Sequence, residues 1–256
     1  MGGLWVYWIS YLDLAIESAL IANLFRNGLY RVYRFFFAYL AADAIETTPA
    51  LIFQSNGRVY GEIYFAGQIA KVVLGFFVVL EIYQHALAKH PALAKFGRSM
   101  AGYALVCAAL ISALAISVDR AIPAGRSQVV HRFNTFERSM DLWMLVLLAM
   151  IGLFIMWFPV RLKRNGVLYI CGFLIYFLSR SAGLLFRNLA PQHNRSIEYG
   201  IATAAIACLT VWLTCLSPKG EEITTVVGHR WRPAEAARLV GQLDAINAKL
   251  MRYSRR

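Results

Sequence analysis

Long apolar stretches constrain this chain more than any other feature. Each is about 20 residues long, the length that a helix needs to cross the roughly 30 Å hydrocarbon layer of a bilayer. They predict an all-α polytopic membrane protein with a seven-helix transmembrane bundle over residues 1–218. The second stretch is polar and the fourth is rich in Ala, so six or eight spans are the alternatives. The seven stretches are residues 4–25, 34–54, 60–84, 99–118, 139–159, 167–187 and 196–217.

The composition supports a lipid environment. Hydrophobic residues make up 59% of the 256 residues and charged residues 16%, whereas soluble domains are about 45–50% apolar and about 25% charged. A single soluble core of this size cannot hide so much apolar surface, and a bilayer can. The net charge of +12 does not predict a nucleic-acid partner, because Lys and Arg gather at the ends of the apolar stretches.

The distribution of Lys and Arg between the loops predicts an orientation. The first, third and fifth loops carry nine of them and residues 219–256 carry eight, against seven on the opposite side. The positive-inside rule therefore places the N-terminus outside and the C-terminus in the cytoplasm, most simply in a bacterial inner membrane. The loop at 119–138 dissents, since it holds four arginines on the predicted outer side.

Six charged side chains fall near the middle of the predicted spans. One charge at the centre of a bilayer costs at least ~2.5–3.5 kcal/mol, so these groups are expected to face one another inside the bundle. Four acids against two bases leave a surplus of negative charge, which predicts that a carboxyl group holds a proton or that a cation is bound. The six predicted binding or proton-carrying residues are Asp13, Glu17, Asp43, Glu46, Lys71 and Arg180. The alternative is that buried ion pairs only fix how the helices pack.

The other acids near span ends are predicted to be interfacial residues that water reaches. Glu62, Asp141 and Glu198 belong to this group on the outer side, and Glu81 belongs to it on the inner side. No catalytic residue, metal site or cofactor is predicted. The five histidines lie at span ends or in loops, and the four cysteines lack metal-ligand spacing.

Residues 219–256 form the second predicted unit, a basic cytoplasmic tail. Pro233 is a favourable first residue for a helix. The tail is predicted to be an amphipathic helix that lies on anionic lipid headgroups. The alternative is that it binds another membrane subunit or a second copy of the chain. Its predicted apolar stripe consists of Leu239, Leu243, Ile246 and Leu250.

Three classes of function fit these features. The first is a small transporter, channel or sensor that binds a proton, an ion or a small solute in the intramembrane polar layer. The second is a non-catalytic structural or assembly subunit of a membrane complex. The third is an intramembrane enzyme that acts on a lipidic substrate, and it ranks last because no nucleophile or metal ligand set is recognisable.

Overall fold

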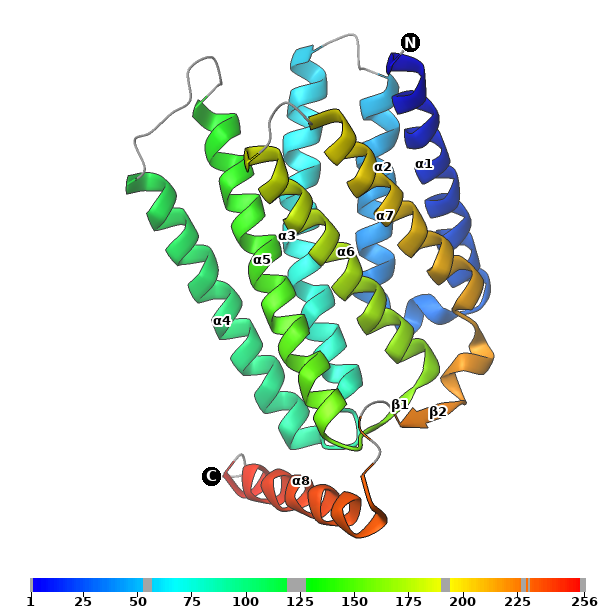
Figure 1. Ribbon diagram of the computed structural model, residues 1–256, viewed down its shortest axis with the longest axis vertical. Helices are drawn as coiled ribbons and strands as arrows, with labels where there is room; N and C mark the ends of the chain where they lie inside the picture. The colour runs from blue at the N-terminus through cyan, green and yellow to red at the C-terminus, as the bar shows by residue number, and fades with distance from the viewer. Residues whose placement is uncertain are drawn as a thin grey trace.

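The computed structural model describes residues 2–52, 57–118, 128–189, 194–226, 229 and 231–253. Within these ranges the chain is almost entirely α-helical, which confirms the predicted all-α class. Seven long helices form a bundle, and an eighth helix lies across one end of it (Figure 1). The helices are α1 Gly2–Arg26, α2 Arg34–Ile52, α3 Gly57–Ala86, α4 Pro91–Val118, α5 Gln128–Trp157, α6 Arg164–Leu189, α7 Asn194–Cys215 and α8 Pro233–Tyr253.

Successive bundle helices run in alternating directions (Figure 1). The N-terminus lies at one end and α8 at the other, and the end that holds α8 is called the tail end below. Helix α3 is central, because it contacts α2, α4, α5 and α6, whereas α1 contacts α2 and α7. Side chains in the last third of α3 such as Val78 and Ile82 are fully buried.

Five of the described helices contain a segment long and apolar enough to cross a membrane, which indicates a membrane location. Helices α2 and α4 are not among the five. They correspond to the two stretches that the sequence marks as unusual, and α2 carries Asp43 and Glu46 in its middle. Seven spans therefore stay a prediction. The segments are Trp8–Arg26, Phe65–Ala86, Ser139–Trp157, Arg164–Gly183 and Ser196–Cys215.

Glycine and proline set several helix boundaries. Gly28 follows α1 with a φ of 69°, a left-handed conformation that only glycine adopts without strain. Pro91 and Pro233 are the first residues of α4 and α8, where the missing amide hydrogen costs no helical hydrogen bond. Pro49 lies inside α2 instead of ending it.

An aromatic cluster joins α2, α6 and α7 in the half of the bundle nearer the tail end. Phe36 packs against Phe173 and Trp212 with ring centroids 5.4 and 4.8 Å apart. Tyr169 packs against Phe36 and Phe173 at 5.2 and 5.1 Å. All four side chains are buried, and offset or edge-to-face rings at such separations stabilise a core beyond the area they bury. Phe36, Tyr169, Phe173 and Trp212 are called the aromatic core below.

The segment that follows α7 is attached to the tail end of the bundle. A short 3₁₀ helix, Pro218–Glu221, leads to strand β2, Thr224–Val226. This strand pairs antiparallel with β1, Arg161–Lys163, between α5 and α6. The amide side chain of Asn165, which is fully buried, donates to the carbonyl of Ser217 at 2.8 Å. The first part of the predicted tail unit is thus bound to the bundle.

Helix α8 contacts the start of α4. The side-chain oxygen of Asn247 accepts hydrogen bonds from the amides of Ala92 and Leu93, at 2.9 and 3.2 Å. These amides belong to the first turn of α4 and have no partner within their own helix, so Asn247 caps α4 from another element. Leu243 is buried, whereas Ile246 of the predicted apolar stripe is exposed.

Replacing Asn247 with Ala is expected to loosen α8, because two amides of α4 lose their acceptor. Loss of a capping side chain costs ~1 kcal/mol, so trypsin should cleave α8 at exposed Lys249 and Arg252 several times faster than in the parent protein. The control is Gln242→Ala, at an exposed position of the same helix. Equal cleavage rates in the two variants would contradict the capping role.

Candidate functional site

Lys71 of α3 bridges two acids of α2. Its ammonium group lies 2.9 Å from Oδ1 of Asp43 and 2.8 Å from Oε2 of Glu46. The three side chains are largely buried, with 10%, 24% and 6% of their surface exposed. Asp43 and Glu46 share a face of α2 because they are about one turn apart. Gly67 makes room for Glu46, since a Cβ atom there would overlap its carboxyl group.

Gln68 connects this pair of salt bridges to α6. Its side-chain nitrogen donates to Oε1 of Glu46 at 3.1 Å, and its side-chain oxygen accepts from Nη2 of Arg180 at 3.1 Å. Gln68 is buried and lies one turn before Lys71 on α3. An amide that both donates and accepts links an acid to a base without adding charge of its own.

Asp141 of α5 is the partner of Arg180 that the sequence analysis missed. Nε of Arg180 donates to Oδ2 of Asp141 at 2.6 Å. Asp141 is 3% exposed, so the prediction that water reaches it as an interfacial residue is wrong. The reason is geometric: α5 begins at Gln128, well before the predicted span, and Asp141 faces the bundle interior on it. Helix rotation of this kind is not visible in hydropathy.

The two acids of α1 complete the set. Glu17 is 1% exposed, and its Oε1 has no hydrogen-bond partner among the described residues. Asp13, one turn earlier, is half-buried, and it interacts electrostatically with Asp43 and Lys71. Glu17 interacts with the same two residues and also with Asp13 and Glu46. The polar layer, as this group is called below, comprises Asp13, Glu17, Asp43, Glu46, Gln68, Lys71, Asp141 and Arg180.

Two tyrosines lie between the polar layer and the aromatic core. The hydroxyls of Tyr39 and Tyr176 are 2.9 Å apart, and Nη1 of Arg180 donates to the Tyr176 hydroxyl at 3.5 Å. Both rings contact Phe173 of the aromatic core, with centroids 6.1 and 6.2 Å away. The layer is thus followed, toward the tail end, by hydroxyls and then by packed rings.

Glu81 forms a separate buried site at the start of α2. Its carboxylate accepts from the amides of Phe35 and Phe36 at 3.3 and 3.4 Å, and from the hydroxyl of Tyr169 at 2.9 Å. A carboxylate is favoured at a helix N-terminus, where amides are unpaired and the helix dipole is positive. Glu81 is 7% exposed, so its predicted interfacial position is wrong. Tyr33, which directly precedes α2, has no side-chain acceptor suited to capping a helix. The sequence therefore indicates that the first amides of α2 need an acceptor from another element.

Glu221 fastens the segment after α7 to the bundle. It accepts hydrogen bonds from the Tyr33 hydroxyl at 2.6 Å, from the Asn165 amide at 2.8 Å and from the Lys163 ammonium at 3.1 Å. Burial alone would raise the pKa of Glu221, but these three donors and the charge of Lys163 outweigh burial and lower it. A lowered carboxyl pKa means that the folded state prefers the ionised form.

Replacing Glu221 with Gln should therefore destabilise the protein at neutral pH and matter less in acid. The stabilisation by the carboxylate is complete above the ordinary Glu pKa, and it disappears as the pH falls through the lower folded-state pKa. We expect the parent and Glu221→Gln proteins to differ by ~1–3 kcal/mol near neutral pH, with the gap closing in acid. Thermal unfolding across pH measures this. The control is Glu222→Gln at the exposed neighbouring position, and a pH-independent gap would refute the assignment.

The structure brings the six predicted residues into one neighbourhood. Lys71 pairs with Asp43 and Glu46, while Arg180 joins them through Gln68. Among the described residues no group of three His, Cys, Asp or Glu side chains could hold a metal ion. Comparisons of the chain with protein-family models, with curated proteins and with solved structures found no match. Fold and site therefore define a class only: a helical protein, suited to a membrane by five apolar helices, with buried charges inside its bundle.

Replacing Lys71 with Met tests whether the α2 acids depend on this one base. Removing one partner of a buried ion pair leaves uncompensated charge, so Lys71→Met should lower the stability by ~3–5 kcal/mol. Adding Asp43→Asn and Glu46→Gln to it should restore most of the loss, because the two acids that pair with Lys71 are then uncharged as well. Thermal unfolding in detergent measures both. Lys95→Met, at an exposed position of α4, is the control, and failure of the triple variant to recover would contradict direct pairing.

Proposed function

We propose that this protein is a seven-span membrane transporter or sensor in which the polar layer binds and releases a proton. The N-terminus faces outside and α8 lies in the cytoplasm. Glu17 is the observation that carries the proposal. It is a fully buried carboxyl group with an oxygen that lacks a hydrogen-bond partner among the described residues. It also interacts electrostatically with three other acids of the polar layer, Asp13, Asp43 and Glu46.

The balance of charge supports a titrating site. Five acids of the polar layer, Asp141 included, face two bases, and four of the five acids interact electrostatically with one another. Asp43, Glu46 and Asp141 have a base within 3 Å. Glu17 has no such partner among the described residues, and an ionised carboxylate buried without one costs several kcal/mol. A proton removes that cost, and a small monovalent cation shared by Glu17 and Asp13 is the alternative charge carrier.

Seven spans are supported by the arrangement of α2 and α4. Both pack lengthwise against neighbouring helices, α2 against α3 and α4 against α3 and α5, and they alternate in direction with their neighbours (Figure 1). The acids of α2 that lower its hydropathy are turned toward Lys71 and not outward. Nine Lys and Arg in the turns and helix ends of the tail end support the cytoplasmic position of that end.

The aromatic core favours gated transfer over an open channel. Between the polar layer and the tail end, a proton would meet the Tyr39–Tyr176 hydroxyl pair and then the packed rings of Phe36 and Phe173. Packed aromatic side chains leave no continuous path for water. Transfer of a proton past this point therefore requires these side chains to rearrange.

A structural role is the second candidate, because the same ion pairs hold α2, α3, α5 and α6 in register. The two functions differ at Glu17, which makes no ion pair among the described residues and so adds little to such a lock. If a substitution of Glu17 abolishes the pH-dependent activity but leaves the protein folded, the proton site is favoured over the structural role.

Replacing Glu17 with Gln is expected to remove a protonated-carboxyl infrared band that changes between about pH 5 and about pH 9. The variant should insert and unfold like the parent, because Gln has nearly the same shape and no charge to bury. In proteoliposomes the parent should move protons down a gradient, or change conformation with pH, and the variant should not.

The control is Glu198→Gln, which removes an exposed carboxyl group of α7 and should leave the band intact. If no band changes in the parent protein, Glu17 does not titrate. If Glu17→Gln keeps full pH-dependent activity, the structural candidate is preferred. If activity follows sodium or potassium and not pH, a cation replaces the proton.

A further inference from the structure

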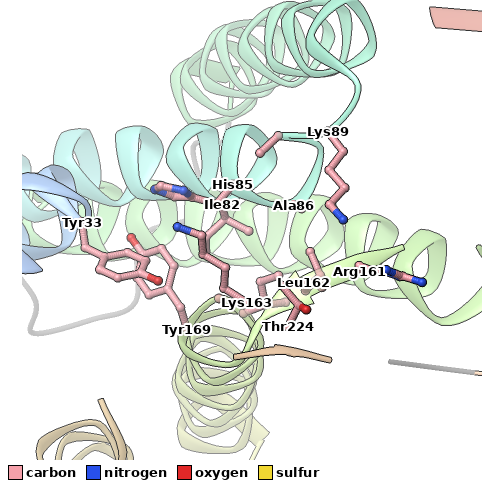
Figure 2. A pocket seen from close by; sticks show the side chains of 13 residues that line it. Tyr33, Ile82, His85, Ala86, Lys89, Arg161, Leu162, Lys163, Tyr169 and Thr224 are labelled. Atoms are coloured by element: carbon pink, nitrogen blue, oxygen red, sulfur yellow. The ribbon is translucent and has the colours of Figure 1, made fainter. Parts of the chain in front are cut away.

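A cavity of about 240 Å³ opens at the tail end between α3, α6 and the two short strands (Figure 2). Its charged lining is basic and comes from separate parts of the chain. Lys89 lies in the turn after α3, and Arg161 and Lys163 lie on β1. Alternation along the strand explains why both β1 bases are exposed, while Leu162 between them is buried. We propose that this cavity binds a phosphate group.

The nearby acids do not neutralise the cavity. Glu221 already accepts from Tyr33, Asn165 and Lys163. Lys163 uses one of its three N–H groups for that contact, so the other two are left for a ligand. The structure gives Lys89 and Arg161 no acidic partner among the residues it describes. Within the part of the chain that the structure describes, two full positive charges are therefore uncompensated at the cavity.

Two of the other polar side chains of the lining, Tyr169 and His85, already have a bonding partner within the protein. The Tyr169 hydroxyl donates to Glu81, which also accepts two amides of α2. A ring nitrogen of His85 lies 3.1 Å from the carbonyl of Val32. The cations are therefore the main donors that this cavity offers to a ligand.

Phosphate fits this donor set better than a carboxylate does. A guanidinium group offers two parallel N–H donors that match two phosphate oxygens, and ammonium groups satisfy the others as point charges. Two or more uncompensated cations match the charge of a phosphate monoester, whereas a carboxylate carries one charge. A second cavity, of about 480 Å³, adjoins it at His85. Its lining holds three bases, Arg31, Arg34 and Arg98, against one acid, Glu81, so the local field attracts anions.

The phosphate could belong to a lipid headgroup or to a soluble anion. Ile82, Ala86 and Ile170 supply apolar walls, and basic pockets between helices at the cytoplasmic end are typical lipid headgroup sites. A soluble phosphate would use the cations but not these walls.

The test titrates the purified full-length protein, in an uncharged detergent, with dioctanoyl phosphatidic acid and separately with inorganic phosphate. Dioctanoyl phosphatidylcholine serves as the zwitterionic reference. The variants are Lys89→Gln with Arg161→Gln, which removes the two uncompensated charges, and Gly166→Leu, which fills the cavity and keeps every charge. Gly166 lines the cavity, and a Cβ atom there meets nothing within 4 Å, so this variant is expected to fold.

The control is Lys249→Gln with Arg252→Gln, which removes two exposed cations from α8. We expect phosphatidic acid to bind the parent, each cavity variant to bind it about tenfold more weakly, and the control to change by about twofold or less. If inorganic phosphate follows the same pattern, the ligand is a soluble phosphate. If it does not bind, the ligand is a lipid.

Three results would overturn the proposal. One is that neither phosphate compound binds. Another is that the control weakens binding as much as the cavity variants do, since binding would then follow net charge alone. The third is unchanged binding by Gly166→Leu, because a ligand inside the cavity cannot share the space with that side chain.

Discussion

The cost of placing charge in an apolar interior is the constraint on which the rest of this structure depends. Lys71 lies at the centre of the bundle and cannot be surrounded by hydrocarbon alone. Asp43 and Glu46 of α2 therefore turn toward it, and that contact fixes the rotation of α2 on α3. Arg180 imposes the same condition on α5 through Asp141. The need to pair Lys71 and Arg180 with acids therefore determines how α2, α3, α5 and α6 pack together.

Helix ends at the tail end are governed by a related requirement. The first amides of a helix have no partner inside it, and here other elements supply the acceptors. Glu81 of α3 serves α2, and Asn247 of α8 serves α4. Glu221 likewise accepts hydrogen bonds from three other parts of the chain, through the side chains of Tyr33, Asn165 and Lys163. These contacts attach the strand pair and α8 to the bundle. They also hold in place the elements that line the cavity beside Arg161.

The sequence predicted more of the fold than of the site, and the difference has a physical origin. Hydropathy and Gly or Pro positions report helix length and helix ends, so the long helices were anticipated. They do not report rotation about the helix axis. Asp141 and Glu81 were consequently placed in water, although one binds Arg180 and the other holds the start of α2. Glu17 was found because its depth alone made it costly.

The sequence by itself determined two things: that the chain is suited to a lipid environment, and that its central charges must find partners inside the protein. Both follow from properties that can be read along the chain, namely the length of each apolar stretch and the position of each charge within it. Which acid meets which base was decided only by tertiary structure. Gln68 joins Glu46 to Arg180, and Lys89 and Arg161 line the same cavity. Such pairings depend on how separate helices are rotated and stacked, and no local pattern of residues encodes that.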